Sequence, residues 1–397
     1  MKRLITIATL LILVSISCTS TPAEQEDNTL TVAPESWQIG ENWHYSQQAI
    51  WNDTFVGVEH IYGDGFKFEG QFISSYNLQT REKERLLEFD KDKFRISPPS
   101  IYENLVVWSS IDISDMPLSE INWNEIDRDI FLLNLDTKEV QQITSEEHIQ
   151  IEPRVYGDTI VWLDTRHVEF SHSPDVFDLY MYDLGTGQET RLTSSTSVED
   201  KQLVISGNLV AWSDNRHSDS EVTSHGGNEP NYNNEIYVYD LVTKDEQRIT
   251  NYVGNDHYPA IDGSRIVWLR QFTFSEAEVF MYDLNSGQET QVSHNRYAVD
   301  NPDIFGNWIV WADSRISLGN TSGDGIINGI SGAAEIYYYA LNIKLETLLV
   351  LSEETGQMGN IVLRQVWLYP VIHGDFIVYT LARGIGPIIY AMRLTEK

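Results

Sequence analysis

The clearest copy of a repeated motif in this chain is GDTIVWLDTR at residues 157–166. A Tyr-rich segment, DLYMYDL, follows at 178–184, and a polar segment, ETRLT, at 189–193. Further copies begin around Trp108, Trp212, Trp268 and Trp311, while Gly57 and Tyr379 hold the same place in degenerate copies. A repeat of this size that carries only strand signals is typical of a β-propeller.

Seven units follow from the leucine that ends each Tyr-rich segment: Leu78, Leu135, Leu184, Leu241, Leu284, Leu341 and Leu394. Each unit offers four strands, here named A to D, with glycine in the tight C–D turns. We therefore predict an all-β, seven-bladed β-propeller of four-stranded antiparallel blades. Six blades is the alternative, because the first unit departs most from the pattern. The last unit lacks strand D, and residues 29–33 are predicted to supply it from the N-terminus.

The charge of the chain limits its partners. It has 397 residues with 59 Asp and Glu against 27 Lys and Arg, a formal net charge of −32. Such a surface repels nucleic acids and anionic headgroups and favours metal ions or cationic ligands. We expect no nucleic-acid partner.

The N-terminus has the pattern of an export signal. Met1-Lys2-Arg3 is basic, and residues 4–16 are apolar but short for a membrane span. The stretch ends in Ser15-Ile16-Ser17-Cys18, which resembles a lipobox and holds the one cysteine of the chain. We predict a signal peptide over 1–18, a lipid anchor at Cys18 that attaches the protein to a membrane of the cell envelope, and a flexible tether over 19–36 that includes the closing strand. An ordinary secretory signal is the alternative.

The pattern Pro-x-Ile-x-Gly-x-x-Ile-Val-Trp-x-Asp-x-Arg, followed by Ile-Tyr-x-Tyr-Asp-Leu, resembles the TolB-type propeller repeat. The resemblance covers about residues 46–397, within a predicted propeller domain at 37–397. It implies a β-propeller of the kind found in exported surface proteins. It implies no single function, because such propellers serve as scaffolds, binding modules and enzymes. TolB also has an N-terminal domain without a counterpart here.

The recurring side chains are predicted to be structural. The repeated Trp is expected to pack between neighbouring blades. Arginines that follow the Trp by four residues, such as Arg166 and Arg216, are expected to pair with the acids opposite, Asp178 and Glu235. In the fifth unit Arg270 takes the aspartate's place, with Glu278 opposite it.

Loop lengths vary most in the B–C and D–A connections, which emerge on one face, so we expect that long-loop face to bind partners. The loop at 320–328, NTSGDGIIN, resembles an EF-hand-type calcium loop. Its predicted ligands are Asn320, Ser322, Asp324 and Asn328, but Ser331 stands where a bidentate acid is expected, so affinity would be weak. No other cofactor is expected.

The D–A connections are predicted to form an acidic ring at the mouth of the central channel, with Glu152, Asp200, Asp256, His257, Tyr258 and Asp300. The sequence shows no catalytic triad, nucleophile elbow or phosphate loop. We therefore predict a monomeric binding module that meets an envelope protein, peptide or glycan, and favour this over an enzyme. The alternatives are a carbohydrate-active lyase or hydrolase that uses the channel, and a structural surface-layer component.

Overall fold

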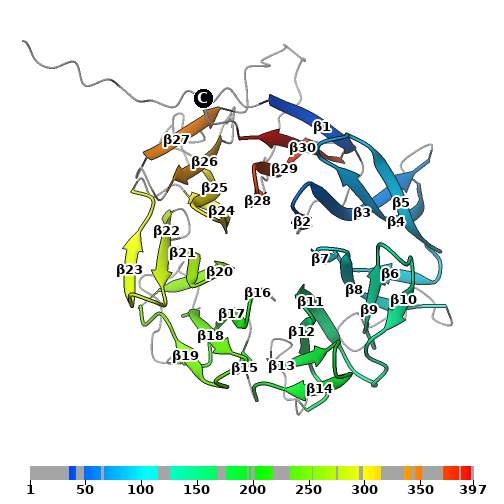
Figure 1. Ribbon diagram of the computed structural model, residues 1–397, viewed down its shortest axis with the longest axis horizontal. Coiled ribbons are helices and arrows are strands. Elements are labelled where there is room, and N and C mark those ends of the chain that lie inside the picture. The colour runs from blue at the N-terminus through cyan, green and yellow to red at the C-terminus, as the bar shows by residue number, and fades with distance from the viewer. Residues whose placement is uncertain are drawn as a thin grey trace, which may run out of the picture. The chain divides into compact units, whose positions relative to one another are not determined.

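The computed structural model describes residues 35–41, 49–63, 67–114, 126–167, 176–194, 196–197, 202–217, 233–252, 254–273, 276–294, 298–313, 335–340, 345–350, 370–383 and 386–394. By its internal contacts the chain divides into two units, and the larger one, Pro34–Leu394, holds every described strand. No described helix is long and apolar enough to cross a bilayer. The β-propeller prediction is confirmed: separate antiparallel sheets stand in a ring around a central channel (Figure 1).

The described strands form seven sheets, numbered here in chain order. Sheet 1 contains β2 (Ala49–Trp51), β3 (Thr54–Tyr62), β4 (Phe68–Asn77) and β5 (Lys83–Phe89). Sheet 2 contains β6 (Phe94–Ile96), β7 (Ser100–Tyr102), β8 (Leu105–Asp112), β9 (Asp129–Asn134) and β10 (Val140–Gln142). Sheet 3 contains β11 (Gln150–Tyr156), β12 (Thr159–Asp164), β13 (Val176–Asp183), β14 (Gln188–Arg191) and the short β15 (Thr196–Ser197).

The second half of the ring repeats this arrangement. Sheet 4 contains β16 (Leu203–Ser206), β17 (Leu209–Asp214), β18 (Glu235–Asp240) and β19 (Glu246–Arg248). Sheet 5 contains β20 (Asn255–Asp262), β21 (Arg265–Thr273), β22 (Glu276–Asp283) and β23 (Gln288–Gln291). Sheet 6 contains β24 (Ala298–Phe305), β25 (Trp308–Asp313), β26 (Glu335–Ala340) and β27 (Leu345–Val350). Sheet 7 contains β28 (Val371–His373), β29 (Phe376–Arg383), β30 (Gly386–Arg393) and β1 (Glu35–Glu41).

Sheet 7 closes the ring with a strand from each end of the chain. β1 pairs antiparallel with β30, with Trp37 opposite Ala391. The closing strand was expected at residues 29–33, which lie outside the described residues, whereas the strand in the structure is Glu35–Glu41. The later segment pairs because it places Ile39, 8% exposed, in the core with Val378 and Ile389.

The core lies between neighbouring sheets, as the repeated tryptophans predict. Trp108, Trp162, Trp212, Trp268 and Trp311 are each at most 1% exposed. Sheets packed on both faces leave no solvated side to their central strands, which explains why Ile-Val-Trp is a continuous apolar run and not an alternating one. Trp162 of sheet 3, for example, packs in one cluster with Val107 and Ile130 of sheet 2.

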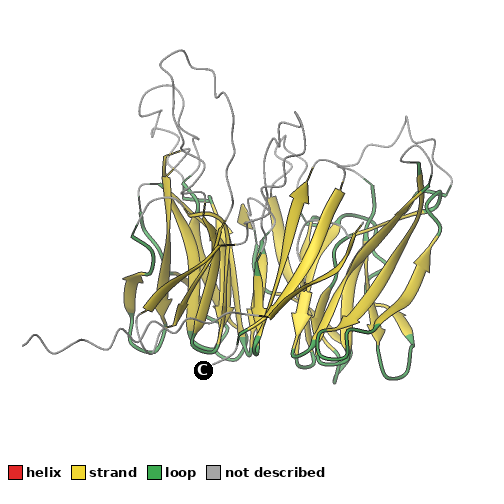
Figure 2. Cartoon of the chain, turned by 90° about the horizontal axis from the view of Figure 1, so that it is seen from above, coloured by secondary structure: helices red, strands yellow, loops and turns green. Residues whose placement is uncertain are grey.

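The A–B and C–D turns lie along one side of the ring (Figure 2). Many A–B turns place glycine where the backbone needs a positive φ, for example Gly157 at 56° and Gly263 at 57°. The innermost strand of every sheet ends at this side, and these strand ends build the site described next.

Candidate functional site

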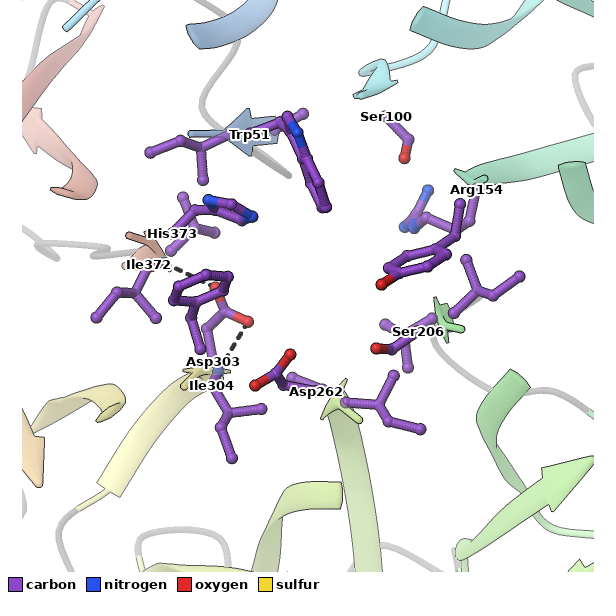
Figure 3. A pocket seen from close by; sticks show the side chains of 18 of the residues that line it. Trp51, Ser100, Arg154, Ser206, Asp262, Asp303, Ile304, Ile372 and His373 are labelled. Carbon is purple, nitrogen blue, oxygen red and sulfur yellow. Dashed lines mark hydrogen bonds between the residues drawn. The ribbon is translucent and has the colours of Figure 1, made fainter. Parts of the chain in front are cut away.

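A cavity of about 330 Å³ lies in the central channel, beside the A–B turns (Figure 3). It is lined by the last residues of the innermost strand of every sheet: β2, β7, β11, β16, β20, β24 and β28. In each of these strands an aliphatic residue, such as Ile304 or Ile372, lies between two variable residues. Side chains alternate along a strand, so the variable residues of one strand share a side.

The rim of the cavity consists of the final residue of each inner strand: Trp51, Tyr102, Tyr156, Ser206, Asp262, Phe305 and His373. Five of these carry rings, and they come from consecutive sheets of the closed ring. We call these five residues, Phe305, His373, Trp51, Tyr102 and Tyr156, the aromatic arc. Each ring contacts the next, because successive ring centroids lie 4.0, 4.4, 4.2 and 4.5 Å apart.

Three polar residues of the rim each join their own sheet to the next one. The backbone N–H of Gly263 donates to Ser206 Oγ at 3.0 Å, and that of Gly306 donates to Asp262 Oδ2 at 2.8 Å. The backbone N–H of Asn52 donates to His373 Nδ1 at 2.8 Å, which links the last sheet to the first. The rim is therefore held rigidly by the scaffold before any ligand arrives.

His373 is neutral in this site. His373 is only 7% exposed, and this burial lowers the pKa of its imidazole to about 4. Because Nδ1 accepts the Asn52 N–H, the proton of the neutral ring lies on Nε2. Nε2 is buried and has no hydrogen-bond partner in the described part of the chain.

Asp303 lies two residues before Phe305 and lines the same cavity (Figure 3). The backbone N–H of Ile304 donates to its Oδ1 at 2.9 Å, and that of Ile372 donates to its Oδ2 at 2.8 Å. Removal from water raises the pKa of Asp303 to about 7, although both hydrogen bonds oppose the shift; the charge of Asp262 adds to it. Within the described residues Asp303 takes part in no ion pair.

The other charged groups at the cavity are paired. Arg154 lines the wall, and its Nη2 lies 3.0 Å from Glu152 Oε2. Asp262 Oδ2 lies 3.6 Å from Arg265 Nη2. The expected channel residue Glu152 thus serves mainly to neutralise Arg154.

Two inner strands bulge at the residue before a proline. Glu152, before Pro153, has φ 54°, and Tyr258, before Pro259, has φ 56°. The pairing register shifts at both places. A left-handed residue at a bulge re-aims the chain, and Tyr258 lines the cavity wall with its ring 4.2 Å from that of His257.

Asp256 is not available to a ligand. It is fully buried and forms two 2.8 Å hydrogen bonds with Arg270, which also contacts Glu289 at 2.8 Å. Burial alone would lower the pKa of Arg270, but its bonds to these two acids raise it above its ordinary value. The sequence placed Glu278 opposite Arg270 and did not indicate the pair with Asp256, which comes from inner strand β20.

The repeated arginines form ion pairs, as expected, but the expected pairs of Arg166 with Asp178 and of Arg216 with Glu235 are not the ones that the structure shows. Arg166 Nη2 lies 2.6 Å from Asp164, the last residue of the strand just before it. Arg191 of β14 pairs with Asp178 at 2.8 Å. In sheet 4, Arg216 pairs with Asp214 at 2.5 Å and Arg248 with Glu235 at 2.6 Å. The acids at the start of strand C, Asp178 and Glu235, are therefore each bound by an arginine of strand D. The spacing between strands B and C did not indicate these partners.

The remaining predicted site residues cannot be placed. Cys18, Asp200 and the calcium-loop residues Asn320, Ser322, Asp324 and Asn328 lie outside the described residues, and Asp300 is described only through its backbone in β24. Much of the long-loop face is outside them too. No group of three or more His, Cys, Asp or Glu that could hold a metal occurs in the part of the chain that is described.

The aromatic arc is the feature that sequence reasoning missed. Its signal was present: the position just before each A–B turn varies from unit to unit, while the residue before it is always Ile or Val. In a repeat protein such a position faces the shared axis instead of the repeated core.

No family model and no curated protein matches this chain. Solved structures do. The β-propeller domain of the Trilobed protease from Pyrococcus furiosus has a TM-score of 0.57 at 10% identity, over 90% of this chain and 95% of that one. Oligogalacturonate lyase in complex with manganese has a TM-score of 0.56 at 11% identity, over 92% and 94%.

TolB from Acinetobacter baumannii is also similar, with a TM-score of 0.39 at 14% identity over 87% of this chain and 80% of that one. The likeness to the Trilobed protease domain and to the lyase shows the β-propeller fold and nothing about activity. The relation to TolB itself stays a prediction from the repeat motif.

Proposed function

We propose that this protein is an exported binding module that receives a ligand in the central cavity. The observation that carries the proposal is the cavity rim: seven strand ends hold five rings and a few polar groups around one opening. Apolar and aromatic walls with a small number of fixed polar groups are the usual composition of a ligand site. Export and the lipid anchor rest on the N-terminal sequence, and loss of membrane association in a Cys18→Ser variant would support the anchor.

The carbohydrate-active alternative has less support. It relied on Asp256, His257, Tyr258 and Asp300 as channel acids and bases. Asp256 is held by Arg270, and a buried carboxylate in a bidentate pair with arginine is a poor proton carrier.

The test measures binding and turnover on the same sample. The protein is titrated by calorimetry with short amines, neutral sugars and oligogalacturonate, with and without Mn²⁺, and the mixtures are then assayed for cleavage products. We expect saturable binding of one ligand class without products. Ala49→Phe, which fills the cavity from β2, should abolish that binding, and Val242→Phe, at a 69% exposed position, should preserve it. Product formation that Ala49→Phe removes would favour the enzyme instead.

A further inference from the structure

The cavity contains one carboxylate, Asp303, that forms no ion pair with any residue the structure describes. Arg154 is matched by Glu152 and Asp262 by Arg265, whereas among the described residues Asp303 accepts hydrogen bonds from two backbone N–H groups alone. A carboxylate removed from water without a cation is costly, and a bound cation would offset that cost.

Rings surround the same opening. Phe305 shares a side of β24 with Asp303, and the Ile372 N–H that binds Asp303 is next in sequence to His373. Phe305 and His373 begin the aromatic arc, which continues through Trp51 to Tyr156. The faces of such rings attract cations, and several rings around one site are the usual means of binding alkylammonium groups.

The rest of the molecule favours the same charge. A formal net charge of −32 gives a field that concentrates cations near the protein and repels anions. Anionic sugars would in addition meet Asp262 and Asp303, which line one part of the wall (Figure 3).

From these observations we infer that the cavity binds a small organic cation, an alkylammonium group held between Asp303 and the aromatic arc. The inference rests on the proposed function and specifies its ligand class. It requires that positive charge, and not shape alone, determines binding.

Choline and its neutral isostere, in which a carbon atom replaces the nitrogen, separate charge from shape. Calorimetric titration of the full chain at moderate ionic strength should give saturable binding of choline, and the isostere should bind at least about tenfold more weakly. Asp303→Asn should remove most of that difference while leaving the affinity for the isostere unchanged, which also shows that the variant is folded. Tyr156→Leu should weaken choline binding, and Asp375→Asn and Tyr62→Leu, both at exposed positions outside the cavity, should not.

Equal affinity for choline and its isostere, or an Asp303→Asn variant that binds choline as the wild type does, would overturn the cation inference. If a neutral sugar binds instead and Ala49→Phe abolishes this binding, the cavity remains a binding site and only the ligand class is wrong. If no ligand of any of these classes binds, the proposed function fails together with the inference.

Discussion

At the scale of single residues, one buried carboxylate in sheet 3 serves two partners at once. Asp164 is fully buried, accepts the Trp162 indole N–H at 3.0 Å, and pairs with Arg166, whose guanidinium lies 4.5 Å from the centre of the Tyr180 ring. Asp214 repeats this arrangement in sheet 4 with Trp212 and Arg216.

Asp164→Ala should therefore lower the free energy of unfolding by about 3 kcal/mol, because it leaves a partly buried guanidinium without its main partner. Urea denaturation measures the loss. The matched control is Asp375→Ala, which breaks a pair 3.5 Å long whose acid is 64% exposed, and should cost less than about 1 kcal/mol. Similar losses in both variants would contradict a bracing role for the repeated pair.

His373 gives a pH dependence. Its pKa is lowered to about 4 from an ordinary 6.5, so the unfolded chain takes up the proton at higher pH than the folded one. The contribution of the neutral imidazole to the free energy of unfolding is thus fully present above pH 6.5. It is lost as the pH falls toward 4, by up to about 3 kcal/mol. His373→Gln does not titrate there, so the stability difference between wild type and variant should shrink by that amount from pH 7 to pH 4. A difference that stays constant over this range would show that His373 does not titrate as described.

At the scale of elements, ring closure depends on β1. Ile39 is buried in the cluster between sheets 7 and 1, whereas Gln38 beside it is exposed. Ile39→Asp should open the β1–β30 pairing and lower the melting temperature by several degrees, since it places an unpaired charge in the core. Gln38→Asp, one residue away on the solvent side, should have little effect. Thermal unfolding followed by circular dichroism compares the two, and equal effects would argue against closure by β1.

The individual strands also show how far the sequence predicts this fold. Strands B and C were predictable because the Ile-Val-Trp run, which is fully buried in β12, β21 and β25, and the Tyr-rich segment after it recur along the chain. The closing strand was expected too early, because 29–33 is apolar, whereas among residues 37–40 of the observed strand Ile39 alone is buried and Trp37 is half-buried. The Asp256 partner of Arg270 was not predictable, because it comes from strand A, and neither was the second contact of Arg166, Glu189, which comes from strand D; the lateral position of both strands depends on the packing of the whole sheet.

At the scale of the whole molecule, the ring converts separate sequence positions into one site. Trp51 and Tyr156 are more than a hundred residues apart, yet their ring centroids lie 6.1 Å apart across the cavity rim. Sequence reasoning placed the site among the loops because loops vary in length. It overlooked variation inside the inner strands, which only the closed ring brings together.

The central claim is that the cavity is the binding site, and the indole resonances of the 11 tryptophans test it most directly. A proton–nitrogen correlation spectrum is recorded during a choline titration, and Trp51→Phe assigns the Trp51 signal. The Trp51 indole signal should move in a saturable manner, while those of Trp162 and Trp212, buried between the sheets, stay in place. Saturable binding that leaves the Trp51 signal unchanged would contradict the claim.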